Sequence, residues 1–297
     1  TLLASSAASD VYKRQAHNEY DILRLLVSLL DDIHNDIFIM IDKKSDMPKD
    51  IEVKHSQIFW LKHRIDIRWG DISGIKAELS LFKCAVRHSS YMYYHLLSGV
   101  DLPIKPIDKI QAFYEDEWLS GRKEFVGFVQ TEDWQYKVKK YHLFTRYYRM
   151  TGLKDRVFSF LRFHGEKWLN AFFQRDNSIE FKKGANWVSI TDDFCRFLVK
   201  NERFILKRFK YTCCADEIFL QTMLWNSPYR NNIYSLDDEY KGCMREVDWN
   251  RGEPHIWGSD TNDYDILRKS DKLFARKFSS KYPEILQKIK ILVGKNI

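Results

Sequence analysis

The chain has 297 residues, of which 44% are hydrophobic and 30% are charged, and its formal net charge is +7. This apolar content is enough for a substantial core, while no stretch is apolar for long enough to cross a bilayer as a helix. A moderate positive charge suits a phosphate-bearing ligand or an anionic membrane surface, and it does not require a nucleic-acid partner. The cysteines are odd in number and show no C-x-x-C spacing, which indicates the reduced thiols of a cytosolic protein.

Residues 1–15 fit poorly with the remainder of the chain. They show no strand-like alternation, and they lack the charged start of a signal peptide. We therefore expect residues 1–15 to be a disordered or foreign leader. No internal repeat or low-complexity linker divides the rest, so residues 16–297 are expected to form a single domain.

Helical and strand-like patterns alternate from residue 16 onward. Apolar residues that recur on one face predict helices over residues 19–31, 75–87 and 108–118. Short apolar runs, typical of buried strands, occupy residues 37–41, 57–61 and 91–97. The alternation predicts a doubly wound α/β sheet, whose ligands bind beyond the carboxyl ends of its strands. Asp42 and Asp101 follow two such ends, where each could be a ligand contact or an ordinary turn residue.

The middle of the chain is aromatic and basic, and it predicts a long helix over residues 153–174. Its apolar stripe consists of Phe158, Leu161, Trp168, Phe172 and Phe173. The simplest interpretation is that this stripe packs on the core. The alternative is a membrane-surface face, because Lys and Arg flank the stripe. Beyond it, patterns predict a strand at 184–190, a helix capped by Thr191, a strand at 244–249, and helices at 262–269 and 280–293.

Two adjacent carboxylates, Asp216 and Glu217, stand where an apolar helix is predicted to begin. Asp216 is a plausible N-cap, and by themselves both acids are most simply explained as helix-terminal residues. An acid held at that point can also face a cleft. Arg276 and Lys277 supply a planar fork and a point charge that could neutralise a diphosphate, or they are solvated charges at a strand edge. The sequence has no P-loop, no G-x-S-x-G motif and no His-rich metal spacing.

Several short motifs, in order from residue 16 to about 278, resemble the branching-enzyme glycosyltransferase family. This family includes core-2/I β-1,6-N-acetylglucosaminyltransferases and peptide O-xylosyltransferases. The matching stretches are Ala16-His17-Asn18, Phe38-Ile39-Met40-Ile41-Asp42-Lys43-Lys44, Trp69-Gly70-Asp71-Ile72-Ser73, Leu97-Ser98-Gly99-Val100-Asp101-Leu102-Pro103-Ile104-Lys105, Gly184-Ala185-Asn186-Trp187, Asp216-Glu217-Ile218-Phe219 with Asn226-Ser227-Pro228, Val247-Asp248-Trp249, and Leu273-Phe274-Ala275-Arg276-Lys277-Phe278.

The resemblance implies a GT-A fold and an inverting, metal-independent transfer from a UDP-sugar to a hydroxyl of a glycan or glycolipid. N-acetylglucosamine is the sugar that it favours. Glu217 matches the family's catalytic base, and Arg276 and Lys277 match its diphosphate clamp. Asp42 matches a uridine or ribose contact. The other positions expected to bind the donor are His17, Gly70, Asp101, Trp187 and, with a departure in spacing around Pro254-His255, Arg251.

Two alternatives and one departure accompany this resemblance. Xylose transfer is one alternative, since several of the stretches are equally similar to peptide O-xylosyltransferases. A non-catalytic module that binds UDP or glycan is the other.

The family's first strand precedes the Ala-His-Asn match, where residues 1–15 stand, so we expect an empty or badly filled central sheet position and reduced stability. We expect no metal cofactor, and a cytoplasmic protein that makes peripheral contact with the inner face of the membrane.

Overall fold

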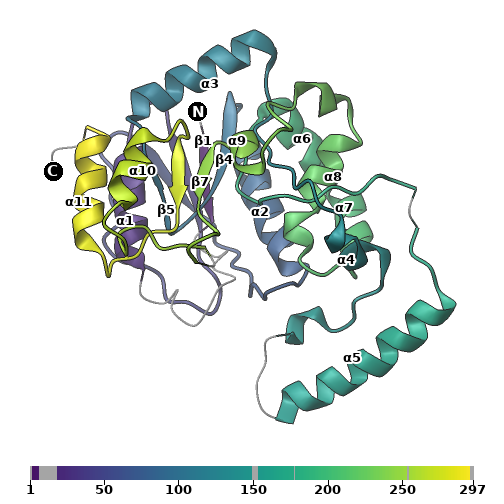
Figure 1. Cartoon of the computed structure of the whole chain (residues 1–297). Coiled ribbons are helices and arrows are strands. Elements are labelled where there is room, and N and C mark those ends of the chain that lie inside the picture. The colour runs from purple at the N-terminus through teal and green to yellow at the C-terminus, as the bar shows by residue number, and fades with distance from the viewer. Residues whose placement is uncertain (1, 7–18, 149–152, 177, 253, 295–297) are drawn as a thin grey trace.

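A five-stranded sheet in the order β3-β2-β1-β4-β6 forms the centre of the protein (Figure 1). The computed structural model describes residues 2–6, 19–148, 153–176, 178–252 and 254–294. The strands are β1 (Leu2–Ser6), β2 (Asp36–Met40), β3 (Gln57–Trp60), β4 (Tyr93–Ser98) and β6 (Ser189–Thr191). The first four pair in parallel, and β6 runs antiparallel to β4. The predicted parallel sheet is therefore present, with an antiparallel edge.

Strand β1 corrects the expectation for the start of the chain. Residues 2–6 are the central strand, paired in parallel with β2 on one side and β4 on the other. Strands buried on both faces need no alternation of polar and apolar residues, so its absence did not argue against a strand. The central position is thus occupied, and the reduced stability expected from an empty one has no structural basis. Residues 7–15 lie outside the described residues.

Helices cover both faces of this sheet, because neighbouring residues of its strands point in opposite directions. Ile37 and Ile39 of β2 pack in a core with α1 (Tyr20–Leu30), α3 (Ile107–Gly121) and α11 (Pro283–Leu292). Phe38 and Met40 pack in a second core. The helices of that second core are α2 (Ser73–His88), α6 (Asp192–Lys200), α7 (Glu202–Phe209) and α8 (Phe219–Trp225).

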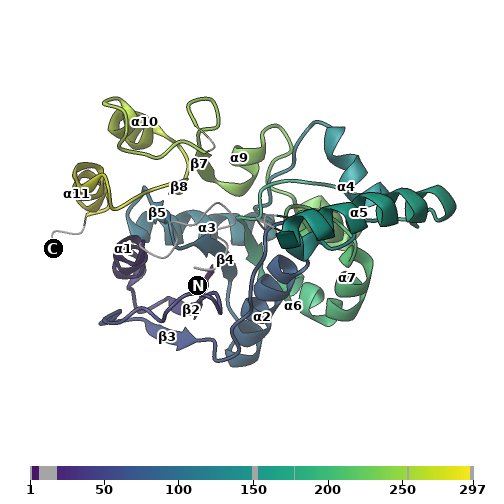
Figure 2. The same cartoon turned by 90° about the horizontal axis from the view of Figure 1, so that it is seen from below.

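A second sheet of three strands lies beside the first and was not predicted as a unit. It consists of β5 (Asp101–Pro103), β8 (Phe274–Arg276) and β7 (Arg245–Val247), in that order. Strand β8 runs antiparallel to β5, and their register sets Asp101 opposite Arg276. The helices α9 (Glu239–Cys243) and α10 (Asp263–Lys269) belong to the same C-terminal part (Figure 2).

Local structure around the two adjacent acids differs from the prediction. Helix α8 begins at Phe219, and a short 3-10 turn, η4 (Ala215–Glu217), precedes it. Asp216 is therefore not an N-cap, and the turn starts instead from Cys214 in a left-handed conformation (φ 51°). The cap predicted at Thr191 is confirmed at the start of α6, since the Thr191 side chain accepts a hydrogen bond from the backbone N–H of Phe194.

Helix α5 (Leu153–Phe172) projects away from the rest of the protein, beyond α4 (Tyr136–Lys139) (Figures 1 and 2). Its predicted span is confirmed, but the expectation that its apolar stripe packs on the core is wrong. Leu161, Trp168 and Phe172 are exposed. The remaining short elements are η2 (Asp133–Gln135), η3 (Thr145–Tyr147) and η5 (Pro228–Asn232). Among the described residues, no helix has the length and apolar content to cross a membrane.

Candidate active site

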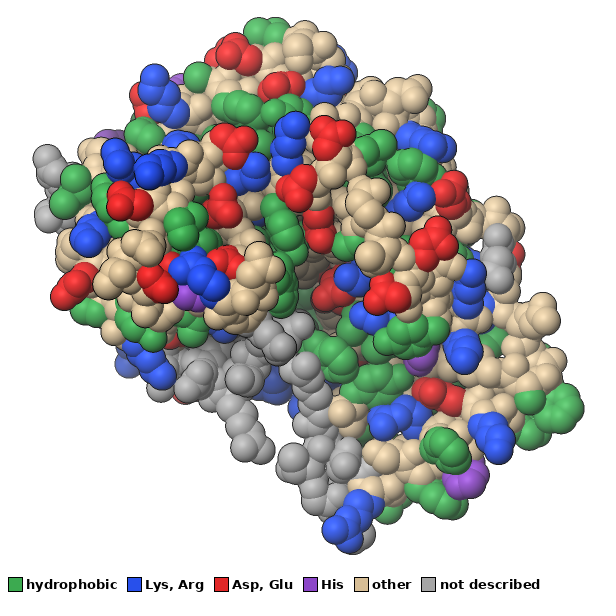
Figure 3. Space-filling view, viewed as in Figure 1, with side chains coloured by type: hydrophobic (Ala, Val, Ile, Leu, Met, Phe, Trp, Pro, Cys, Tyr) green, Lys and Arg blue, Asp and Glu red, His purple; other side chains and the backbone are tan. Residues whose placement is uncertain are grey.

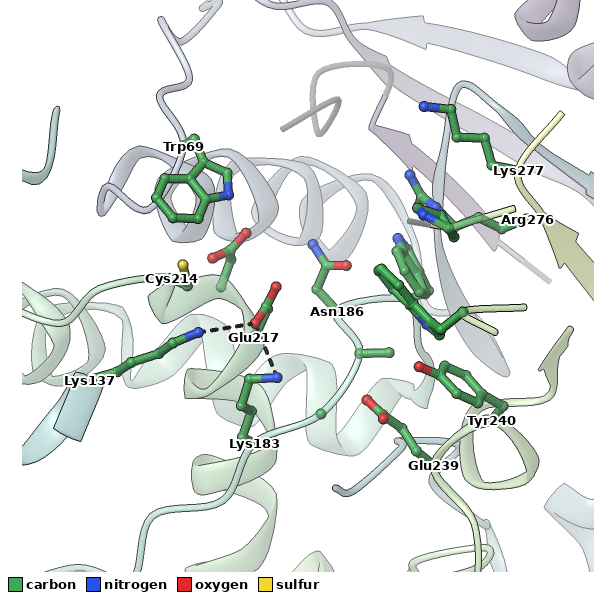
Figure 4. Close-up of a pocket in the computed structure, with 16 residues that line it drawn as sticks. Trp69, Lys137, Lys183, Asn186, Cys214, Glu217, Glu239, Tyr240, Arg276 and Lys277 are labelled. Carbon is green, nitrogen blue, oxygen red and sulfur yellow. Dashed lines mark ion pairs between the residues drawn. The ribbon is translucent and has the colours of Figure 1, made fainter. Parts of the chain in front are cut away.

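A cavity of about 300 Å³ lies where the two sheets and the segment before α8 meet (Figure 4). The same face of the molecule is hollowed near its centre, where acidic and basic side chains gather (Figure 3). The lining includes Trp69, Lys137, Lys183, Gly184, Ala185, Asn186, Trp187, Cys214, Asp216, Glu217, Glu239, Tyr240, Trp249, Pro254, Arg276 and Lys277. Residues 184–187, predicted as part of a strand, form instead a loop that lines this cavity.

Glu217 lines the cavity with a side chain that is 33% accessible. Its carboxylate lies 3.2 Å from the Lys183 ammonium and 4.0 Å from that of Lys137 (Figure 4). The backbone of Glu217 is held as well, because its carbonyl accepts a 2.9 Å hydrogen bond from Gly184. Two ammonium groups and a rigid turn therefore fix this carboxylate at the cavity wall.

The neighbouring Asp216 points into the protein and packs on α2. A Cβ added to Gly74 would lie 3.2 Å from the Asp216 Cβ, a tight contact that glycine avoids. Burial raises the pKa of Asp216 to about 7, and the charge of Glu217 adds to the effect. Burial also raises the pKa of Glu78 on α2 well above its ordinary value, with a contribution from Asp216. Burial thus favours the neutral, protonated forms of the two carboxyl groups behind Glu217.

Arg276, at the end of β8, faces the same cavity although it is only 5% exposed. Its Nη1 lies 3.4 Å from Oδ1 of Asp101, and its guanidinium lies 4.0 Å from the centre of the Trp187 ring. Within the described part of the chain, its Nε and Nη1 make no hydrogen bond. A guanidinium that lines a cavity is suited to receive a carboxylate or a phosphate, because its planar fork of N–H donors matches the spacing of their oxygens. Lys277 lines the cavity beside it (Figure 4).

Asp101 lies behind Arg276, where it does not line the cavity. It is 1% exposed, and it accepts hydrogen bonds from the backbone N–H of Ser98 at 2.8 Å and from the Ser98 hydroxyl at 3.0 Å. The direct sugar contact expected for Asp101 is therefore not supported. Its position indicates that it holds Arg276 in place.

The remaining predicted donor-binding residues that the structure describes do not line the cavity. Asp42 forms a 2.8 Å ion pair with Lys44 at the end of β2. Gly70 shapes the turn before α2, with φ of 71° and a carbonyl that accepts from Cys214 at 3.2 Å. Arg251 is engaged by Asp248 at 2.6 Å and Asp263 at 2.9 Å, which leaves it poorly placed to assist a phosphate. His17 lies outside the described residues.

The cavity is lined by four predicted site residues, Glu217, Trp187, Arg276 and Lys277. It is also lined by residues that the sequence did not single out. The most important of these are Lys137 and Lys183, the two partners of Glu217. Lys183 directly precedes the Gly184-Ala185-Asn186-Trp187 motif, which was an available signal. Lys137 is one of several lysines in the basic middle of the chain, and nothing in the pattern distinguished it from the others.

The chemistry of the lining is a carboxylate on one side of the cavity and fixed cations on the other. Among the residues that the structure describes, no three His, Cys, Asp or Glu side chains cluster as a metal site would need. An anion in the cavity can be neutralised by the cationic side chains of Lys137, Lys183, Arg276 and Lys277. This set can accept a proton at one end and stabilise a growing negative charge at the other.

Comparison with known proteins identifies the family of this chain. No curated protein sequence gives a significant match to the chain. A family model does match, and its match begins at residue 11, inside the stretch 1–15 that was expected to fall outside the family. That model describes the Core-2/I-Branching enzymes and covers residues 11–270, most of the chain, so this protein belongs to the Core-2/I-Branching enzyme family of glycosyltransferases.

Proposed function

We propose that this protein is an inverting, metal-independent transferase that moves a sugar from a UDP-sugar to a hydroxyl of a glycan acceptor. One observation carries the proposal: the carboxylate of Glu217 and the guanidinium of Arg276 line one cavity (Figure 4). The sheet order and the smaller mixed sheet beside it support a GT-A fold for a single domain, which the pairing of β1 extends from the expected residues 16–297 to include residues 2–6.

Glu217 is the proposed general base. As the acceptor oxygen forms its bond to the anomeric carbon, the hydroxyl proton passes to the Glu217 carboxylate. The bond between that carbon and the diphosphate oxygen breaks on the opposite side, and its electron pair leaves with UDP. Attack opposite the leaving group inverts the anomeric configuration. Lys183 and Lys137 keep the carboxylate oriented toward the cavity.

Arg276 and Lys277 are the proposed clamp for the departing diphosphate. Negative charge grows on the leaving oxygen as the bond breaks, and cations that are already in place stabilise it without reorganisation. Asp101 behind the guanidinium and the Trp187 ring beside it restrict how Arg276 can move. Asp42 stays the proposed contact with uridine or ribose, while Gly70 and His17 stay proposed parts of the donor site.

Donor identity is proposed from the family resemblance. N-acetylglucosamine is the first candidate, and xylose is the alternative because the shared motifs fit peptide O-xylosyltransferases equally well. A non-catalytic UDP- or glycan-binding module is the second alternative, which the intact set of Glu217, Arg276 and Lys277 disfavours. All five cysteines are free thiols, which supports a cytoplasmic location. A role in polysaccharide biosynthesis would follow from a glycan or glycolipid acceptor.

The deciding experiment is UDP release from a panel of UDP-sugars, measured with glycan acceptors in the presence of either a chelator or manganese. We expect release with UDP-N-acetylglucosamine that the chelator does not reduce. Preference for UDP-xylose would favour the first alternative. Binding of UDP without release from any donor would favour the non-catalytic module, and strict dependence on manganese would refute the proposed mechanism.

A further inference from the structure

Helix α5 presents its apolar residues to the solvent. Phe160, Phe163, Trp168 and Phe172 are between 59% and 71% exposed. Val157 and Leu161 are exposed on the same helix. A helix on the surface of a water-soluble protein normally turns such residues toward the core. So many large apolar side chains together on one projecting helix indicate a surface that another apolar phase covers.

Three polar residues of α5 contact the protein and fix the orientation of the helix. Glu166 accepts a 2.7 Å hydrogen bond from the backbone N–H of Leu143. The Asn170 side chain accepts from the backbone of Tyr141 at 2.7 Å and donates to it at 3.0 Å. Arg162 lies 4.4 Å from the centre of the Tyr148 ring. The helix cannot rotate its apolar side inward without breaking these contacts. The contacts therefore keep the apolar side chains exposed to the solvent.

Within residues 156–172, the charge on the exposed side of α5 has one sign. Arg156 and Lys167 are exposed along with the apolar residues. Within residues 156–172 the single acid is Glu166, and its carboxylate bonds to the protein's own backbone. Hydrophobic and basic side chains gather over α5 at the lower right of Figure 3. Aromatic residues bordered by cations are typical of helices that lie in the interface of an anionic membrane.

A second copy of the chain fits this surface less well. Two α5 faces packed together would set cations against cations, whereas anionic lipid headgroups complement them. At 1.5 Å per residue, a 20-residue helix is about 30 Å long, so it can make an extended contact with a flat surface. The charge complementarity therefore favours a lipid surface as the occupant.

The segment that anchors α5 also reaches the cavity. Tyr148, which packs on Arg162 of α5, lies 6.2 Å from the Trp69 ring in the cavity lining. The carbonyl of Lys137, whose ammonium faces Glu217, accepts a hydrogen bond from Cys213 in the segment that leads to η4. Helix α5 is thus attached to the side of the cavity that carries the proposed base, where an acceptor hydroxyl would enter.

We propose that the exposed face of α5 lies in the headgroup region of an anionic bilayer and presents the Glu217 side of the cavity to an acceptor anchored in that same bilayer. The docking surface consists of Val157, Phe160, Leu161, Phe163, Trp168 and Phe172, with Arg156 and Lys167 at its border. The part concerning the acceptor rests on the proposed transferase function, and the part concerning docking does not.

Co-sedimentation of the purified protein with vesicles tests the docking. We expect binding to vesicles that contain phosphatidylglycerol, and little binding to phosphatidylcholine alone. The double variant Trp168→Ser and Phe172→Ser removes two aromatic anchors and should lower the partition coefficient by at least about tenfold. Lys167→Glu should weaken binding to the anionic vesicles most strongly at low salt. The double variant Leu119→Ser and Ile291→Ser, at sites that are 70% and 66% exposed on α3 and α11, is the matched control and should bind normally.

Three results would overturn the docking surface. These are equal partitioning with both vesicle types, equal loss of binding in the control variant, and a wild-type dimer that the α5 variant dissociates in light scattering. Turnover separates this idea from the proposed function. The α5 variant should transfer to a soluble acceptor normally and lose turnover only with a lipid-linked acceptor in vesicles. If the wild type transfers no sugar to any acceptor, the proposed transferase function is contradicted. Membrane docking by α5 is then tested by the vesicle experiment alone.

Discussion

The buried pair of Asp101 and Arg276 provides the sharpest test of the site. The substitution Asp101→Asn keeps the shape of the side chain while removing its charge, so it leaves the Arg276 guanidinium uncompensated. The carbonyl oxygen of the new amide can still accept from the backbone N–H of Ser98, which preserves the local turn. The amide cannot replace a carboxylate that lies 3.4 Å from a guanidinium.

The size of the effect can be worked out from this geometry. Two unit charges 3.4 Å apart attract by about 5 kcal/mol at an effective dielectric constant of about 20. Removal of one partner from a buried pair typically costs about 3–5 kcal/mol, because the other charge stays buried. We therefore expect the free energy of unfolding to fall by about 3–5 kcal/mol, which for a chain of this length corresponds to a decrease in Tm of roughly 5–9 °C.

Binding of UDP should show whether Arg276 contacts the diphosphate or only forms a structural ion pair with Asp101. If the diphosphate binds against Arg276, it supplies the negative charge that the variant lacks. Saturating UDP should then raise the Tm of Asp101→Asn by more than it raises that of the wild type.

Thermal unfolding with and without UDP measures both effects. Asp193→Asn is the control, since its 2.7 Å pair with Arg122 is about half exposed and should contribute less than about 1 kcal/mol. An unchanged Tm for Asp101→Asn would show that the pair does not stabilise the fold. An equal UDP-induced increase in both proteins would show that Arg276 does not meet the diphosphate.

Three further predictions concern the cavity and its surroundings. Glu217→Gln should lower turnover by at least about a hundredfold, with UDP affinity in calorimetry nearly unchanged, whereas Glu239→Gln should cost much less; near-normal turnover would remove Glu217 from its role. Because burial raises the pKa of Asp216 from 3.8 to about 7, the folded protein binds this proton more tightly than the unfolded chain, and stability falls as pH rises through that window. Asp216→Asn should therefore flatten the pH dependence in denaturant titrations between pH 4 and about 8, by at most about 4 kcal/mol, and an unchanged profile would contradict this assignment. Arg251→Met should lower the free energy of unfolding by about 1–3 kcal/mol, because buried Asp263 loses a cation, and a tenfold loss of UDP affinity would instead return Arg251 to the donor site.

Local patterns predicted much of the fold. The apolar run after α1 is a strand buried on both faces, and Thr191 caps a helix, because each feature depends on residues close together in the sequence. Glu217, Arg276 and Lys277 could be selected as candidates from motifs that resemble those of a known family. The family membership is confirmed by a family model that matches residues 11–270.

Tertiary structure decided which of these residues act together. Asp101 and Arg276 meet only through the register of β5 and β8, and Lys183 meets Glu217 only because the loop before β6 passes η4. Burial of Asp216 against α2 is likewise a long-range contact that no local pattern encodes. The amphipathic pattern of α5 predicted a helix with an apolar side but not which side faces the protein, because hydrogen bonds to residues 141–143 set that orientation. Periodicity reports which residues share a face, and only packing between distant segments determines what that face meets.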